Sequence, residues 1–328
     1  MVDLSTKYMG MNLKSPIIAA SSGLTNSLQD LKEIEKYGAG AVVIKSLFEE
    51  EINNELLKSL ANMNKPVTLY PEIYNFFSYD DAEDSVSSYL FLIEKAKNVL
   101  QIPVIASINC VSVNDWTGFS KRIEEAGADG IELNLFLLPS DFHRTTEETE
   151  KVYFEVINAV KKEVKIPIAL KTSFYFTNLG QMLLKLSETG ISALVLFNRF
   201  WSPDFDIDNF KILSSHVLST PGELALSLRW IAIMSNRVKC DLAASTGIHD
   251  GRAVIKQLLA GANAVQVASA IYRNGFPRIQ KMLDEVAEWM ESKKFKSINE
   301  FRGMLSQTKS DDPAAFERIQ FMKHFSGK

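Results

Sequence analysis

Residues 126–135 read Ala-Gly-Ala-Asp-Gly-Ile-Glu-Leu-Asn-Leu, and this stretch contains the two signals on which the fold prediction rests. The glycine at 127 is the left-handed residue that commonly closes a helix, and the apolar run after it has the length of a strand. The same punctuation recurs as Tyr-Gly-Ala-Gly-Ala from Tyr37, Thr-Gly-Ile-Ser-Ala from Thr189 and Ala-Gly-Ala-Asn-Ala from Ala260. These repeats predict helices that alternate with buried strands.

Eight short apolar runs are the expected strands: Pro16–Ser21, Ala41–Lys45, Pro103–Ile108, Ile131–Leu135, Pro167–Lys171, Ala193–Asn198, Asp241–Ser245 and Ala264–Ser269. Most are separated by amphipathic stretches of helix length; after the third run Asn114 is the expected cap and Gly127 the expected end. Eight strands alternating with helices predict a (β/α)8 barrel, the TIM-barrel fold. A doubly wound sheet is the alternative, but no Gly-x-Gly-x-x-Gly follows the first run.

The composition is that of an ordinary folded protein, with 328 residues, 46% hydrophobic and 23% charged. We expect one domain over residues 1–328, with long connections at 46–102 and 199–240 and a short helical tail at the C-terminus. The net charge is -4 and the basic residues are scattered, which argues against nucleic-acid and membrane partners. The N-terminus carries no long apolar stretch, so we expect a cytoplasmic protein.

Polar residues gather at the carboxyl ends of the runs, where a barrel carries its functional groups. These ends are Ser21-Ser22-Gly23, Lys45-Ser46, Ser107-Ile108-Asn109, Glu132 with Asn134, Lys171, Asn198-Arg199, Ser245-Thr246-Gly247 and Ala268-Ser269. Apart from Asp241 and Gln266, polar side chains are absent from the rest of the runs. This distribution marks one end of the barrel as a site.

The ends of the last two runs, residues 245–247 and 268–269, contain only small residues. Small residues let backbone N–H groups approach an anion, and the loops after strands seven and eight are the usual phosphate cradle of the barrel. The alternative is that Gly247 only makes a turn. Two small loops together favour a phosphate site.

Lys45 and Lys171 end apolar strands and therefore point into a mouth shielded from water. Either lysine could neutralise a reduced flavin or an anionic substrate, or form a Schiff base. The alternative is a lysine that reaches along the rim to a carboxylate, and the acidic residues 49–51 strengthen that alternative for Lys45.

Asn109, Asn134 and Asn198 offer paired donors and acceptors that suit the edge of a flat heterocycle such as flavin, although any one of them could instead brace a loop. His143, in the loop after the fourth run, is interpreted as an exposed histidine. The aromatic residues between 70 and 79 are interpreted as a packed lid. The four histidines and two cysteines have no metal-ligand spacing, so no metal site is expected.

The strand ends resemble those of the dihydroorotate dehydrogenase family. The resemblance extends from about Leu4 to about Met304. The resemblance rests on Ser15–Gly23, Val43–Ser46, Ile131–Asn134, Ala169–Lys171, Asn198, Ala244–Ile248, Gly261-Ala262 and Gln266–Ala270. It implies an FMN cofactor with Lys171 near the ring, residues 245–247 and 268–269 at the phosphate, and a homodimer. It also implies oxidation of dihydroorotate to orotate in pyrimidine synthesis.

Two departures concern the substrate. The family places a Cys or Ser base shortly after the fourth-strand asparagine, where this chain has Leu137, which cannot accept a proton. The family's Asn-x-x-Gly-x-x-Asn segment is replaced by Tyr-Pro-Glu-Ile-Tyr-Asn-Phe-Phe at 70–77. The candidate replacement bases are Ser140, Asp141, His143 and Tyr74. The expected catalytic residues are Lys171, Lys45, Asn134 and Ser140.

The leading hypothesis is an FMN-dependent oxidoreductase acting on a CH–CH bond of dihydroorotate. The alternatives are an FMN oxidoreductase for another small anionic substrate, a Schiff-base aldolase with Lys171 as the amine, and a non-catalytic flavin-binding subunit of a larger complex.

Overall fold

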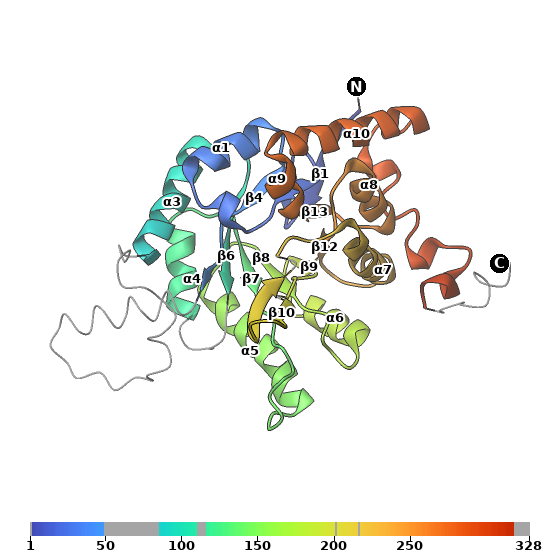
Figure 1. Cartoon of the computed structure of the whole chain (residues 1–328). Helices are drawn as coiled ribbons and strands as arrows, with labels where there is room; N and C mark the ends of the chain where they lie inside the picture. The colour runs from blue at the N-terminus through green and yellow to red at the C-terminus, as the bar shows by residue number, and fades with distance from the viewer. Residues whose placement is uncertain (1, 49–84, 110–115, 201, 216, 318–328) are drawn as a thin grey trace, which may run out of the picture.

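The computed structural model describes residues 2–48, 85–109, 116–200, 202–215 and 217–317 (Figure 1). Its eight barrel strands are β3 (Ile17–Ala19), β4 (Ala41–Val43), β6 (Val104–Asn109), β7 (Gly130–Asn134), β8 (Ile168–Thr172), β9 (Ala193–Leu196), β12 (Asp241–Ser245) and β13 (Ala264–Val267). Each strand pairs in parallel with the next one, and β13 pairs back with β3. The predicted (β/α)8 barrel is confirmed, and the doubly wound alternative is wrong.

Helices cover the outside of the barrel (Figure 1). They are α1 (Leu28–Lys36), α3 (Ser85–Val99), α4 (Trp116–Glu125), α5 (Thr146–Glu163), α6 (Leu179–Ser187), α7 (Leu224–Met234) and α8 (Gly251–Ala260), followed by α9 (Ser269–Asn274) and α10 (Pro277–Lys293). Helix α5 shows why such segments form: a Thr145–Glu148 capping box starts it, and Tyr153, Val156 and Val160 bury one face. Gly127, with a φ of +91°, follows α4 as predicted.

The amino end of the barrel is closed by an N-terminal hairpin of β1 (Thr6–Tyr8) and β2 (Met11–Leu13). Its apolar residues join the inward-facing barrel residues in one cluster: Tyr8, Met9, Leu13, Ile18, Ala41, Val43, Ile105, Ala169, Ala193, Val195, Ala243 and Ala264. The Met9 N–H donates to Asp241 at 2.8 Å, and the Thr6 hydroxyl donates to the Asn263 carbonyl at 2.8 Å. The barrel is therefore a packed core open only toward its carboxyl end.

Side chains alternate along a strand, so the residue two positions after an inward-facing one also faces inward. Ala169 and Ala243 belong to the inner cluster, which directs Lys171 and Ser245 into the mouth. In the sheet register Asn134 is paired with Lys171, and Gln266 with Ser245, so these two residues face the mouth as well. The strand pattern thus places four polar side chains at one end of the barrel.

The two long connections contain further elements. Strand β5 (Leu47–Phe48) pairs with β6, α3 ends the first connection, and the predicted aromatic lid, including Tyr74, lies outside the described residues. The second connection forms the hairpin β10 (Ser202–Asp206) and β11 (Lys211–Ser215) before α7 begins. The C-terminal segment contains short 3-10 turns at Ile298–Glu300, Gln307–Lys309 and Pro313–Phe316. Within the described ranges, no helix is long and apolar enough to cross a membrane.

Candidate cofactor and active site

A cavity of about 570 Å³ opens at the carboxyl ends of the barrel strands. Its lining includes these predicted site residues: Ser21, Ser22, Lys171, Asn198, Ser245, Thr246, Gly247, Ala268 and Ser269. Arg199, Ser219, Gln266 and Tyr272 line it as well. The volume lies in the range of small-molecule sites, about 300–1,000 Å³. The fold thus brings residues from five separate strands to one cavity.

Ser46 and Gly23 support the side of this cavity near β3. The Ser46 hydroxyl lies 2.9 Å from the Ser21 hydroxyl and 2.8 Å from the Ser107 hydroxyl, which forms a short chain of hydroxyl groups. Gly23 lies so close to Tyr272 that a Cβ at this position would be 2.7 Å from the tyrosine oxygen. A side chain at this position would therefore have to displace the end of the Tyr272 side chain.

Asn109 and Asn134 end the neighbouring strands β6 and β7, and Asn198 follows β9. Asn198 donates from its side-chain nitrogen to the Asn134 side-chain oxygen at 2.8 Å, and Asn109 is paired with Asn134 in the β6–β7 register. The side-chain oxygen of Asn198 accepts the N–H of Arg199 at 2.9 Å. Both functional groups of Asn198 are therefore engaged within the protein. Of the three asparagines, Asn198 lines the cavity, whereas Asn109 and Asn134 do not.

Lys45 does not join Lys171. It lines a separate cavity of about 410 Å³ that includes Ser46, Tyr89 and Lys95. Lys45 lies in the irregular stretch between β4 and β5, where the chain has one residue more than the segment of β6 that it pairs with, since Val43 is paired with Ile105 and Leu47 with Ile108. The Ser46 N–H in this stretch donates to the Ser21 hydroxyl at 2.7 Å. Of the two predicted lysines, only Lys171 reaches the larger cavity.

Lys171 lies above a buried polar pair inside the barrel. Its ammonium group donates to the Gln266 Oε1 at 2.9 Å and lies 3.6 Å from the Glu132 Oε1. Gln266 in turn donates from Nε2 to the other oxygen of Glu132. All three side chains are more than nine-tenths buried, so the carboxylate offsets the lysine charge where water cannot.

Gly247 is required by its backbone and by its surroundings. Its φ is +78°, a region that disfavours residues with a Cβ, and a Cβ there would lie 2.1 Å from the Leu224 nitrogen. The start of α7 therefore packs directly on the loop after β12. A turn at Gly247, the alternative given by the sequence, explains the positive φ. It does not explain the close packing against Leu224, which is a second constraint.

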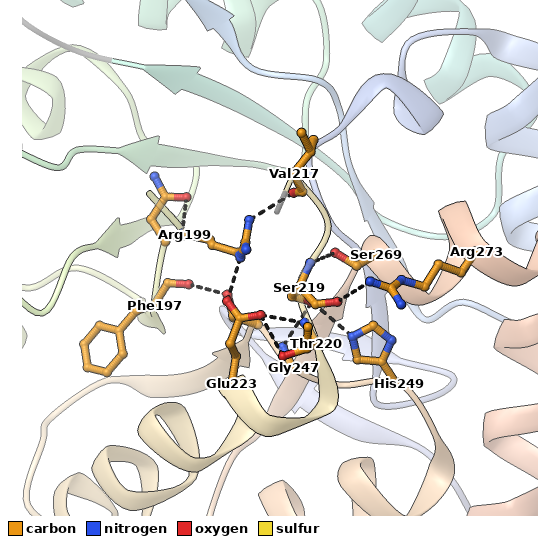
Figure 2. A network of polar contacts seen from close by, with 12 residues as sticks. Phe197, Arg199, Val217, Ser219, Thr220, Glu223, Gly247, His249, Ser269 and Arg273 are labelled. Atoms are coloured by element: carbon orange, nitrogen blue, oxygen red, sulfur yellow. Dashed lines mark hydrogen bonds and ion pairs between the residues drawn. The ribbon is translucent and has the colours of Figure 1, made fainter. Parts of the chain in front are cut away.

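Residues 217–223, here called the strap, lie against the small loops of the cavity (Figure 2). The Ser219 N–H donates to the Ser269 hydroxyl at 3.0 Å, and the Ser219 hydroxyl lies 3.1 Å from the His249 Nε2. Arg273 donates to the Ser219 carbonyl at 3.2 Å. Burial, assisted by the Arg273 charge, lowers the pKa of His249 below its ordinary value.

Both ends of the strap are held by Arg199. Its Nε donates to the Glu223 Oε1 at 2.7 Å, and its Nη1 donates to the Val217 carbonyl at 3.0 Å (Figure 2). Burial opposes the charged form of Glu223, but hydrogen bonds from Arg199 and Thr220 outweigh it and lower the pKa of this carboxyl group. The strap is thus tied at both ends by charged and polar contacts.

The candidate bases after β7 lie away from the cavity. Ser140, Asp141 and His143 are exposed in the loop before α5, and none of them lines the cavity. Leu137 packs partly buried against the core, and its N–H donates to the Tyr153 hydroxyl at 3.1 Å. The same loop exposes the apolar side chains of Leu138 and Phe142 as well as its polar residues.

The sequence predicted neither the strap nor the roles of its partners Glu223, His249 and Arg273, and Arg199 was noted only as a polar residue at a strand end. Thr220-Pro-Gly-Glu223 has the pattern of a capping box, which is a signal for the start of α7. The contacts with residues 249, 269 and 273 join segments far apart in the chain, and no local pattern indicates them.

Other candidate chemistry gives no site in the described part of the chain. No group of three or more His, Cys, Asp or Glu side chains is placed to hold a metal ion there. Cys110 lies outside the described residues. Cys240 immediately precedes β12, at the amino end of the barrel, where burial raises the pKa of its thiol to about 12. It is therefore remote from the mouth and not a thiolate nucleophile.

The barrel has a cavity at its carboxyl end that is lined by Lys171 and by two loops of small residues. These features define an α/β-barrel protein with a small-molecule site. A model of the family described as dihydroorotate dehydrogenase matches residues 3–290. The chain belongs to the dihydroorotate dehydrogenase family, a family of oxidoreductases whose enzymes are flavoproteins that use FMN.

Three archaeal relatives are each named dihydroorotate dehydrogenase B (NAD(+)), catalytic subunit. The protein of Thermoplasma volcanium is 26% identical over 319 residues, which cover 93% of this chain and 99% of that protein. The protein of Methanocaldococcus jannaschii is 26% identical over 310 residues, with 92% and 97% covered. The protein of Pyrococcus furiosus is 26% identical over 311 residues, with 92% and 99% covered.

Proposed function

We propose that this chain is an FMN-dependent oxidoreductase that acts on a CH–CH bond of a small anionic substrate. The observation that carries the proposal is the single cavity into which Lys171, Asn198 and the small loops at 245–247 and 268–269 all converge. Its donor set suits FMN, because hydroxyl and backbone N–H groups surround one end and an ammonium group lies at the other.

In this proposal residues 245–247 and 268–269 hold the phosphate, and Lys171 lies near the flavin ring. Ser21, Ser22 and Asn198 complete the walls. Gly23, Ser46, Asn109 and Asn134 lie beside these residues at the strand ends and would support them. Bound FMN supplies a hydride acceptor. The ammonium group of Lys171 stabilises the negative charge that develops on the ring, and Glu132 with Gln266 fixes its position.

The substrate side of the proposal rests on the orientation of two amides. The Asn198–Asn134 hydrogen bond directs the Asn134 N–H donors toward a ligand, where they would bind a carbonyl or carboxylate oxygen. Oxidation of a CH–CH bond also requires a base for the second hydrogen, within hydrogen-bond reach. Leu137 cannot serve, and Ser140 is exposed and does not line the cavity. Ser140 would act as the base only if its loop moves toward the mouth when the substrate binds, and Ser140→Ala tests this role.

The Schiff-base alternative is disfavoured by the surroundings of Lys171. A nucleophilic lysine is typically desolvated in an apolar pocket or placed next to another cation. Lys171 instead lies 3.6 Å from a buried carboxylate and donates to Gln266. Its ammonium group is an ion-pair partner rather than an unpaired amine.

The first experiment is the visible absorption spectrum of the purified protein, followed by anaerobic addition of dihydroorotate. We expect a yellow protein. Bleaching by dihydroorotate establishes the family substrate, whereas a protein that stays yellow retains the cofactor and excludes that substrate. A colourless protein that takes up no added FMN contradicts the proposal. Lys171→Met is expected to lose flavin. Phe142→Ala, which changes an exposed side chain of the β7–α5 loop, is the matched control.

We also propose that the protein assembles as a homodimer. The relatives are named catalytic subunits, which indicates that they act within assemblies. The β10–β11 hairpin supports the same view, because its residues Phe205, Phe210 and Ile212 are each more than two-thirds exposed. Light scattering of the eluted protein is expected to give twice the mass of one chain, and a monomer at all concentrations would contradict the proposal.

A further inference from the structure

A second cavity, of about 360 Å³, adjoins the cofactor cavity and has a different lining. Its walls carry four aromatic side chains from the loops after β8 and β9: Phe174, Tyr175, Phe197 and Phe200. The two cavities share Asn198, Arg199, Phe200, Ser245 and Thr246. We call the second one the aromatic cavity. The two cavities therefore adjoin along these shared residues.

The aromatic side chains hold one another in place. The Phe174 and Tyr175 rings are stacked with centroids 4.5 Å apart, and Tyr175 meets Phe200 edge-on at 4.8 Å. Phe200 also meets Phe136 edge-on at 4.6 Å, and Phe174 meets Phe197 at 5.8 Å. Such pairs restrict ring rotation, so the cavity presents preformed flat apolar walls.

Polar groups of the aromatic cavity are engaged within the protein. The Thr246 hydroxyl donates to the Phe197 carbonyl at 3.3 Å, and the Ser227 hydroxyl donates to the Leu224 carbonyl at 3.2 Å. Asn198 uses both of its side-chain groups, as described above. Arg199 and Glu223 form an ion pair, which cancels their charges. The groups that remain to contact a ligand are chiefly the aromatic faces.

We propose that the aromatic cavity is a subsite for a planar apolar group of the substrate. The substrate would be an acid that bears an aryl or similarly conjugated group next to the carbons that react. This inference rests on the proposed function for its link to redox chemistry. The aryl group enters the aromatic cavity, and the acid lies toward Asn134 and Lys171.

The test uses trans-cinnamate, a planar aryl acid with the unsaturated bond that CH–CH oxidation produces. Its binding is measured by calorimetry with FMN-loaded and flavin-free protein. Ala225 is exposed and lines the aromatic cavity, so Ala225→Trp fills the cavity without entering the core. Tyr175→Ala removes a ring that is 41% exposed, and Tyr175→Phe is its conservative partner.

We expect trans-cinnamate to bind the wild-type protein about tenfold more tightly than it binds Ala225→Trp or Tyr175→Ala. Tyr175→Phe and the exposed control Phe142→Ala should bind as the wild type does, and each variant should keep its uptake of FMN. Absence of cinnamate binding, or equal binding by all variants, overturns the proposal. If FMN does not bind but the cinnamate pattern is observed, the aromatic subsite stands and only the proposed function fails.

Discussion

The two halves of the barrel mouth are built from different chemistry. The half above β12, β13 and β3 consists of small residues, and its hydroxyl and N–H groups bond to the strap and to one another. The half formed by the loops after β7, β8 and β9 consists of large apolar side chains, among them Phe136, Phe174, Tyr175 and Phe200. A ligand meets backbone and hydroxyl groups on the first side and ring faces on the second.

This difference shows which part of the family pattern the chain retains. The small-residue half keeps the family motifs Ser15–Gly23, Ala244–Ile248 and Gln266–Ala270. The aromatic half keeps Ile131–Asn134, Ala169–Lys171 and Asn198, but the loop after β7 contains one of the two departures, Leu137. Substitutions in the first half should therefore lower stability and cofactor retention, whereas substitutions in the second should mainly change the choice of ligand.

The largest effect is expected for Glu132→Ala, beneath the cofactor cavity. Removal of this carboxylate leaves the buried ammonium group of Lys171 without its anion and Gln266 without its acceptor. Breaking a buried pair in this way costs about 3–5 kcal/mol of unfolding free energy. Urea unfolding followed by tryptophan fluorescence measures the loss.

Glu188→Ala is the matched control, because Glu188 pairs with Lys239 at the surface. Exposed pairs contribute at most about 1 kcal/mol. A double substitution, Glu132→Leu with Lys171→Met, should recover most of the stability lost in Glu132→Ala. Equal losses for Glu132→Ala and Glu188→Ala would show that the buried group is not an essential ion pair.

A smaller loss is expected for Gly247→Ala. The new Cβ would have to move the Leu224 backbone away, and the residue would stay at a φ of +78°. Together these effects cost about 2–4 kcal/mol, and FMN uptake should weaken because the loop lines the cofactor cavity. Gly222→Ala, in the same strap, places its Cβ 3.9 Å from the nearest atom and should stay within about 0.5 kcal/mol. Equal melting temperatures for the two variants would contradict this prediction.

The smallest effect concerns pH and His249. Because its pKa is lowered in the folded protein, the unfolded chain binds the proton more readily. The neutral His249 therefore contributes to the free energy of unfolding. This contribution is complete above pH 6.5, the ordinary pKa of histidine, and is lost as the pH falls below that value. Stability should therefore decline less in His249→Asn than in the wild type between neutral and mildly acidic pH. A difference in unfolding free energy between the two proteins that stays constant over that pH range would argue against this role of His249.

Much of the fold could be predicted because its signals are local. Apolar runs, the glycines that close helices and the polar residues at strand ends each occupy a few neighbouring positions, and the barrel brings all such ends together. Lys171 and the small loops were found in this way. Lys45 shows the limit of the method, because the irregular stretch between β4 and β5 interrupts the strand and Lys45 lines another cavity.

The remaining parts of the site depend on contacts between distant segments. The aromatic cavity requires residues 174–175, 197–200 and 222–227 to meet, and the strap is held by His249 and Arg273. The Lys171–Glu132–Gln266 cluster joins three strands. Glu132 and Gln266 were visible as polar residues in apolar runs, but their mutual pairing follows only from the barrel register.

The hairpin that closes the amino end of the barrel has a consequence for synthesis. Its residues Thr6 and Met9 bind Asn263 and Asp241, and β3 pairs with β13, so the first segments made have their partners among the last. Contacts of such sequence separation raise the contact order and delay folding. The nascent chain must hold its first strand unpaired until nearly the whole protein has left the ribosome. The ligand cavity, which needs β12, β13 and β3 together, is thus completed only near the end of translation.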